Sequence, residues 1–135
     1  MAATNTAPRD LVTQQINYIR KRITFADRGK TITVGYLPAG AVVCGGGVQI
    51  VTAFNGSGTD LLDVGFIGAT TDPDAYGSAL TLAAIGFIAL DELGAVSNIQ
   101  QPDAYTVTCL YTDANSDATT GAADVVVWFI PNNDA

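Results

Sequence analysis

The chain has 135 residues, a net charge of −7 and only 14% charged residues, against 48% hydrophobic ones. This is the length of one domain, and it allows a core without disulfide or metal staples. The sequence contains no histidine, which excludes Ser-His-Asp and Cys-His nucleophilic systems and removes the commonest zinc ligand. We therefore expect no enzyme, no cofactor and no metal site.

The charges are divided unevenly along the chain. All the basic residues lie within the first thirty positions: Arg9, Arg20, Lys21, Arg22, Arg28 and Lys30. Two acids accompany them, so this segment carries four net positive charges and the remainder carries eleven negative ones. The acidic body should repel nucleic acid and anionic membranes. We hypothesise that Arg9, Arg20, Lys21 and Arg22 bind an acidic surface of a partner protein. The alternative is a solvated strand face that balances the acidic domain.

Residues 1–17 are expected to form an N-terminal arm ahead of a single domain over 18–135. Thr6, Ala7 and Pro8 could cap a helix, but the apolar spacing that follows is incomplete. An extended arm is therefore the preferred interpretation, with a short helix as the alternative. We expect no signal peptide, because the N-terminus lacks an apolar region, and no apolar stretch is long enough to span a bilayer.

From residue 18 onward the hydrophobic pattern has a period of two, with turn signals about every ten residues. Ile19 and Ile23 share one side of the first predicted strand, and Arg20 and Arg22 share the other. Residues 26–29 read as a turn. This alternation is typical of a strand with one face on a core.

Two further strands follow, over 31–36 and 42–54. The turn between them, 37–40, combines proline and glycine in a way that predicts type I geometry. Three successive glycines, 45–47, interrupt the longer strand and predict a bulge or a sharp bend. A tight connection over 55–58 ends it.

The middle of the chain is less regular. Residues 62–66 alternate as a strand, and 70–77, which includes Pro73, reads as an irregular loop. Residues 79–84 fit either a short helical turn or a strand edge. A strand is predicted over 86–90.

The C-terminal part contains two more strands. Residues 105–112 alternate between apolar and threonine side chains, and 113–121 form a polar turn. Residues 125–130, including Trp128, are apolar on both faces, which indicates an interior strand or one that lies against a neighbour. The whole pattern predicts an all-β fold, a β-sandwich of about eight strands, with a jelly roll as the preferred version.

Few residues are candidates for catalysis, ligand binding or metal binding. Cys44 and Cys109 both lie in apolar segments, so two buried free thiols are expected, with one disulfide as the open alternative. The glycine run after Cys44 lacks the GK[ST] ending and the helix of a phosphate loop. Asp72 and Asp74 could contribute oxygens to a cation, but two carboxylates at this spacing are more typical of a solvated turn.

The aromatic residues allow two interpretations. Tyr105, Tyr111, Trp128 and Phe129 occur at strand spacing, which favours a place in the core. They could instead stack on sugars or bases, but no basic residue is near them in the sequence, which disfavours base stacking.

Several segments resemble a family of small virion proteins of tailed bacteriophages. The resemblance covers the first two thirds of the chain and rests on residues 9–15 (RDLVTQQ), 35–43 (GYLPAGAVV), 51–56 (VTAFNG) and 62–68 (LDVGFIG). It implies a jelly-roll head decoration, or cement, subunit that forms homo-oligomers on the capsid exterior and binds across joints between major capsid proteins. The family offers no catalytic residues to transfer. The glycine run 45–47 departs from the bulkier strand residues expected there.

We therefore expect a phage structural protein, made in the host bacterial cytoplasm, whose partners are the major capsid protein and other copies of itself. The low charge content also favours an assembly subunit, because a monomer would expose much apolar surface. The alternatives are a tail, neck or head-fibre component, or a carbohydrate-binding β-sandwich module that uses Trp128.

Overall fold

The structure of the protein is a computed structural model, and it describes residues 16–94 and 103–131. The elements in these residues are β1 (Asn17–Thr24), the 3-10 turn η1 (Phe25–Asp27), β2 (Thr31–Leu37), β3 (Val42–Thr52), β4 (Asp60–Ile67), β5 (Thr71–Thr81), β6 (Gly86–Ala89), β7 (Tyr105–Asp113) and β8 (Ala122–Ile130). No helix in this part of the chain is long and apolar enough to cross a membrane. Residues 1–15 of the predicted arm lie outside the described residues, so the arm stays a prediction.

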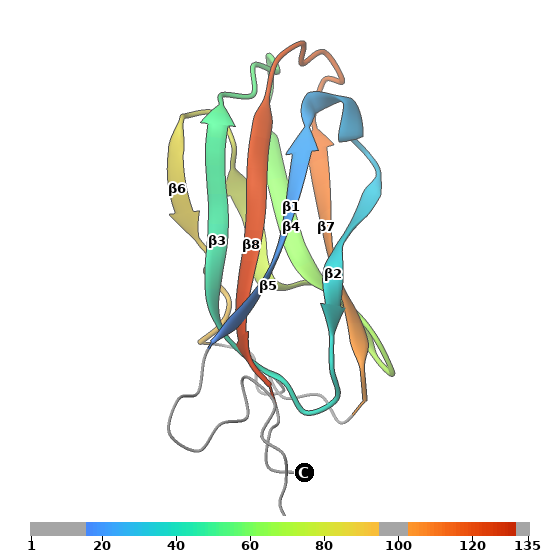
Figure 1. Cartoon of the computed structure of the whole chain (residues 1–135). Coiled ribbons are helices and arrows are strands. Elements are labelled where there is room, and N and C mark those ends of the chain that lie inside the picture. Colours follow the sequence, from blue (N-terminus) through green and yellow to red (C-terminus); the bar gives the residue numbers. More distant parts are fainter. Residues whose placement is uncertain (1–15, 95–102, 132–135) are drawn as a thin grey trace, which may run out of the picture.

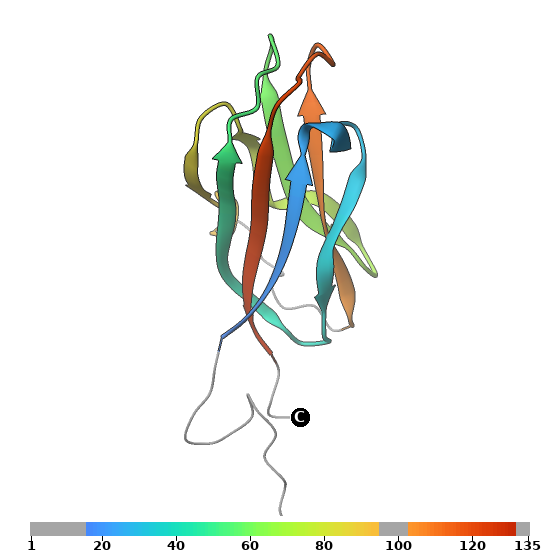
Figure 2. The same ribbon diagram turned by 45° about the horizontal axis from the view of Figure 1, so that its top comes forward.

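The strands form two antiparallel sheets packed face to face (Figures 1 and 2). The front sheet has the order β1-β8-β3-β6 and the back sheet the order β2-β7-β4-β5. Each sheet places the last strand of the chain that it contains between two early ones, which is the arrangement of an eight-stranded jelly roll. The predicted all-β jelly-roll sandwich is confirmed.

The core lies between the two sheets and follows from the alternation in the sequence. On β8, Val125, Val127 and Phe129 face inward and are buried. On β7, Val107 and Tyr111 do the same from the opposite sheet. Because each strand sends every second side chain inward, these alternating positions fill the space between the layers.

The irregular loop predicted over 70–77 is wrong, because all of these residues except the first belong to strand β5 (Thr71–Thr81). Pro73 is tolerated there since β5 is an edge strand, whose outer N–H groups need no partner in the sheet. The strand is distorted at Ala79, which has a φ of 53°. Its N–H and that of Ser78 bond to the carboxylates of Asp63 and Asp91.

The turn after β2 also differs from the prediction. The N–H of Ala41 donates to the carbonyl of Pro38 at 3.2 Å, and Gly40, the third residue of that turn, has a φ of 76°. A positive φ at the third position defines a type II turn instead of type I. Glycine is the residue that takes up this conformation without a steric penalty.

Two buried carboxylates join the connections at one end of the sandwich, which is uppermost in Figure 1. Asp60 accepts a hydrogen bond from the hydroxyl of Tyr111 at 2.7 Å and one from a backbone N–H of the β3–β4 connection. Asp113, whose side chain is completely buried, accepts one from Arg28 at 2.9 Å. A buried charge must be paired, so these contacts hold the loops on the core.

The two cysteines are free and differ in exposure. Cys109 on β7 is buried, as expected, and burial raises the pKa of its thiol to about 12. Cys44 is exposed, so the prediction that both are buried is wrong. Cys44 is the extra residue of a bulge in β3, between Val43 and Gly45 in the pairing with β8, which turns its side chain out of the core.

Candidate functional site on the outer face of the front sheet

The side of the front sheet that faces away from the core carries the main candidate site, and we call it the outer face. It is formed by the strand residues whose side chains alternate with those of the core: Tyr18, Arg20, Arg22, Gln49, Val51, Phe87, Asp124, Val126, Trp128 and Ile130. Pairing between strands places Trp128 beside Tyr18, and Gln49 beside both Asp124 and Phe87. Residues far apart in the sequence therefore share one surface.

Three aromatic side chains are exposed on this face. The exposed fractions are 41% for Trp128, 50% for Phe87 and 64% for Tyr18. The preferred interpretation that Trp128 lies in the core is wrong, because it is Phe129 that points inward on β8. Tyr105, Tyr111 and Phe129 are buried, as expected. The two-sided apolar pattern of β8 thus reflects a core on one side and an exposed apolar surface on the other.

The glycine run in β3 makes room for these aromatic rings. A Cβ atom placed on Gly45 would lie 2.6 Å from Cε3 of Trp128, and one on Gly47 would lie 2.3 Å from Cζ of Phe87. Real Cβ atoms do not approach other atoms so closely, so a side chain at either position would displace a ring. The predicted bulge is confirmed at Cys44, and the two glycines explain why bulkier residues are absent from this stretch of strand.

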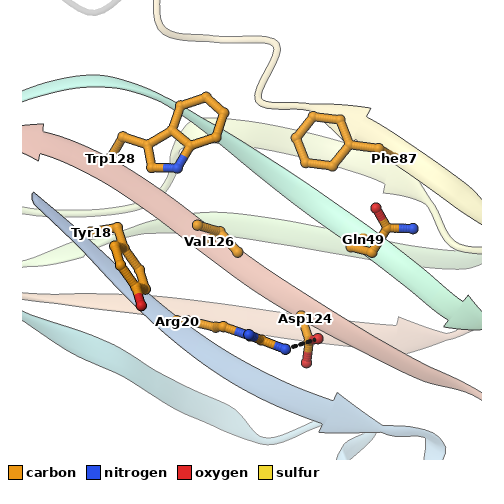
Figure 3. Close-up of a pocket in the computed structure, with 7 residues that line it drawn as sticks. All are labelled: Tyr18, Arg20, Gln49, Phe87, Asp124, Val126 and Trp128. Carbon is orange, nitrogen blue, oxygen red and sulfur yellow. Dashed lines mark hydrogen bonds and ion pairs between the residues drawn. The ribbon is translucent and has the colours of Figure 1, made fainter. Parts of the chain in front are cut away.

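The aromatic side chains surround a shallow groove of about 410 Å³ centred on Val126. In Figure 3, Trp128 and Phe87 lie along one side, and Tyr18 and Arg20 lie along the other. Gln49 and Asp124 supply amide and carboxylate groups at one end. The groove thus combines apolar rings with a small number of polar groups, as binding surfaces commonly do.

Charge on the outer face is concentrated in one cluster. Arg20 Nη2 lies 2.6 Å from Asp124 Oδ2, and Arg22 Nε lies 2.5 Å from Asp124 Oδ1. The hydrogen bond from Arg22, followed by that from Arg20, holds the pKa of the Asp124 carboxyl below its usual range. The side chain of Asp124 is only 8% exposed, whereas that of Arg20 is 57% exposed. Two cations therefore share one anion, and the cluster keeps a net positive charge.

The structure separates the basic residues that were predicted to act together. Arg20 and Arg22 lie on the outer face, but Lys21 alternates to the other side of β1 and is exposed at the edge of the sandwich. Arg9 lies outside the described residues. A partner-binding role for these four residues stays a prediction.

Other residues of the groove could not be found from the sequence. Tyr18, Gln49, Phe87 and Asp124 come from four different strands, and only the strand order brings them together. A local signal existed in the glycines at 45 and 47, because glycine within a strand often marks a close approach by another group.

Two other groups of titratable side chains lie away from the outer face. The hydroxyl of Tyr76 donates to that of Tyr105 at 3.1 Å in the core, and burial raises the pKa of both phenols. Asp72 and Asp74 are exposed on β5, and among the described residues no group of three or more His, Cys, Asp or Glu side chains could hold a metal ion. The outer face therefore remains the candidate site.

The fold is shared with chains of phage capsids. A chain of the cyanophage Pam1 capsid asymmetric unit matches with a TM-score of 0.64 and 20% identity, over 97% of this chain and 99% of that one. A chain of the Ralstonia phage GP4 capsid matches with a TM-score of 0.63 and 21% identity, over 87% and 85%. A chain of the acidic stable capsid of Helicobacter pylori bacteriophage KHP30 matches with a TM-score of 0.61 and 18% identity, over 87% and 89%.

At the level of sequence, no protein-family model and no curated protein matches the chain. The likeness to the three capsid chains therefore establishes a common fold.

Proposed function

We propose that the chain is a structural protein of a bacteriophage virion, and more narrowly a capsid decoration, or cement, protein. The observation that carries the proposal is the match over nearly the full length of chains from three phage capsids. Because each match covers most of both chains, the capsid chains are similar in length to this one. A unit of 13.9 kDa suits a subunit that is added to a shell.

The outer face is the proposed contact with the major capsid protein. It presents Trp128, Tyr18 and Arg20 around one groove, and these three residue types are the ones that most often dominate the binding energy of protein interfaces. An exposed apolar patch of this kind supports an interface on a small acidic domain. The basic cluster at Arg20 and Arg22 would face acidic groups of the partner.

In this role the protein lies on the capsid exterior and stabilises the head by binding across joints between major capsid proteins. Many modest contacts, repeated by symmetry, hold such a shell without any single strong contact. Copies also bind one another as a homo-oligomer, and the predicted arm over 1–17 adds a contact to a neighbouring subunit. Such a role needs no catalysis, and the protein is made in the host bacterial cytoplasm.

The proposal is tested on purified particles of the phage that encodes the chain. Mass spectrometry should find the protein in many copies per particle, and a reconstruction should place it on the head exterior between major capsid proteins. Particles made without the gene should lose their contents at a lower temperature and recover when the purified protein is added back. Density at the tail, neck or a head fibre would replace the cement role with that of another virion component, and absence from particles would reject both.

A second candidate function is favoured by the exposure of Trp128. Aromatic rings beside carboxylate, guanidinium and amide groups are suited to stacking on a sugar ring while the polar groups bind its hydroxyls. The groove would then be a carbohydrate-binding site. Binding of the purified protein to a glycan array, lost in Trp128→Ala, would support this function.

A further inference from the structure

One lateral edge of the sandwich is basic. It is formed by β1, β2 and their connection, and it carries every basic residue of the described chain: Arg20, Lys21, Arg22, Arg28 and Lys30. Arg20 and Arg22 share Asp124, and Arg28 pairs with Asp113. Lys21 and Lys30 are exposed and form no ion pair within the described residues. We call this the basic edge.

The opposite lateral edge is acidic. In the pairing order of each sheet it is formed by the strand farthest from the basic edge, which is β6 in the front sheet and β5 in the back sheet. Five carboxylates lie on these strands or directly beside them: Asp63, Asp72, Asp74, Asp91 and Glu92. None of them pairs with a base in the described part of the chain. We call this the acidic edge.

The segment after β6 packs on β5 and gathers these acids. The N–H of Glu92 donates to the carbonyl of Tyr76 at 3.1 Å, and Asp91 accepts the N–H of Ser78 at 3.1 Å. Desolvation by neighbouring atoms, followed by hydrogen bonding with Asp74, raises the pKa of the exposed Asp72 carboxyl. The negative charges of this edge are therefore crowded and lack a cation of their own.

The strand pairing also places the two lysines of the basic edge at heights close to those of two acids of the acidic edge, Asp63 and Asp91. Thr31, next to Lys30, pairs with Leu110, which pairs with Asp63 on the far side of the back sheet. In the front sheet, Lys21 pairs with Val125, which pairs with Val48. Val48 in turn pairs with Ile88, three residues before Asp91. A second copy displaced sideways, with its strands in the same direction, would bring lysines opposite carboxylates.

We propose that the basic edge of one copy docks against the acidic edge of a second copy, so that copies associate side by side and head to tail. Because two different surfaces meet, the interface is heterologous, and it closes into a ring when the rotation between copies allows it. The charges on one molecule are complementary to those on the next, which sets orientation and speeds association. Exposed ion pairs are individually weak, so the association should be sensitive to salt.

This inference specifies the surface of the homo-oligomer in the proposed function, but it needs no capsid. It is measured on the purified full chain, whereas the virion role is measured on particles. Either proposal can therefore fail without the other.

The first test uses carbodiimide cross-linking, which joins a carboxylate to an amine in direct contact. Lys21 and Lys30 are the only lysines in the chain, so few links are available. In an equal mixture of isotope-labelled and unlabelled copies, mixed links should join these lysines to the five acids of the acidic edge. Their yield should fall about tenfold from about 0.01 M salt to about 1 M, where the Debye length is about 3 Å. Mixed links that avoid the acidic edge, or no mixed links at all, would overturn the proposal.

The second test exchanges charges. Lys21→Glu with Lys30→Glu makes both edges negative, and Asp72→Lys with Asp74→Lys adds positive charge to the acidic edge. By sedimentation at low salt, each variant alone should associate much less than the natural chain, whereas an equal mixture of the two should associate again. These four side chains are exposed, and circular dichroism should show unchanged strand content.

The control is Asp103→Lys, at an exposed acid just before β7 that belongs to neither edge as defined above. It changes net charge in the same direction as the substitutions at Asp72 and Asp74 and should leave association unchanged. A natural chain that is monomeric at low salt, or a mixture that fails to associate, would contradict head-to-tail docking.

Discussion

Trp128 lies where a side chain at Gly45 would have to be. A Cβ atom at Gly45 would lie 2.6 Å from Cε3 of the indole, so the ring on β8 and the missing side chain on β3 form one arrangement. This relationship places the single tryptophan of the chain on the outer face with part of its ring covered by backbone. The conformation of the proposed binding surface thus depends on a glycine in a neighbouring strand.

Gly45→Ala should displace the indole into solvent and shift its fluorescence emission to longer wavelength. The free energy of unfolding should change by no more than about 1 kcal/mol, because the ring has open space on its outer side and alanine is better than glycine within a strand. Gly94→Ala is the matched control, since a Cβ there would meet nothing within 4 Å. An unchanged emission spectrum in Gly45→Ala would show that the ring does not depend on this glycine.

Trp128→Ala should lower the free energy of unfolding by about 1–2 kcal/mol, because the ring is already 41% exposed. Phe66→Ala, at a fully enclosed ring of β4, should cost about 3–5 kcal/mol in the same urea titration. When equal amounts of folded protein are compared, Trp128→Ala should lose more binding to particles or to glycans than Phe66→Ala does. A cost for Trp128→Ala equal to that for Phe66→Ala would place the indole in the core.

The layers of the fold could be predicted from the sequence, because alternation fixes which side chains face inward. The two-sided apolar pattern of β8 could not be resolved in this way. On one side of β8 the apolar residues fill the core. On the other side, the local sequence does not distinguish a second core from an exposed binding surface. The position of Trp128 depends on β3, which is about eighty residues away in the sequence.

Strand β5 shows a second limit of sequence-based prediction. Proline and closely spaced acids are typical of a loop, and they disfavour an interior strand. The strand forms because it is at a sheet edge, where Pro73 needs no partner for its nitrogen. Asp63 and Asp91 then bond to the N–H groups that its distortion leaves without a strand partner. These bonds come from β4 and from the segment after β6, and local propensity does not reveal them.

Arg28→Ala should destabilise the end of the sandwich where Asp113 is buried. The carboxylate would lose its only ion pair in the described structure, and removal of one partner of a buried pair costs about 3–5 kcal/mol. Arg28→Lys should recover only part of this, because the guanidinium also donates to the carbonyl of Ala118 at 2.8 Å. Chemical denaturation would measure both changes. Equal stability of Arg28→Ala and the natural chain would mean that solvent reaches Asp113.

The two thiols should react at very different rates in the folded protein. A disulfide reagent at neutral pH should modify Cys44, which is exposed, and spare Cys109, whose burial removes access and raises its pKa to about 12. Thiol titration should therefore give one fast equivalent in buffer and two in denaturant. Cys44→Ser should abolish the fast equivalent, and a fast reaction that persists in this variant would show that Cys109 is accessible.

Asp124→Asn should make stability depend less on pH in the acid range. The folded-state pKa of Asp124 is lowered, chiefly by its hydrogen bond with Arg22, so the ionised form stabilises the fold. That contribution is complete above the unfolded-state pKa of about 3.9 and is lost as the pH falls through the lower folded-state pKa. In urea titrations across this range, the natural chain should be more stable than the variant at neutral pH, and the difference should disappear in strong acid. Asp103→Asn, at an exposed acid that forms no ion pair among the described residues, is the control for the loss of one carboxylate. A difference in stability between the natural chain and Asp124→Asn that stays constant with pH would show that the carboxylate contributes through its shape and neutral hydrogen bonds. Its charge would then not be needed to hold the two arginines on the outer face.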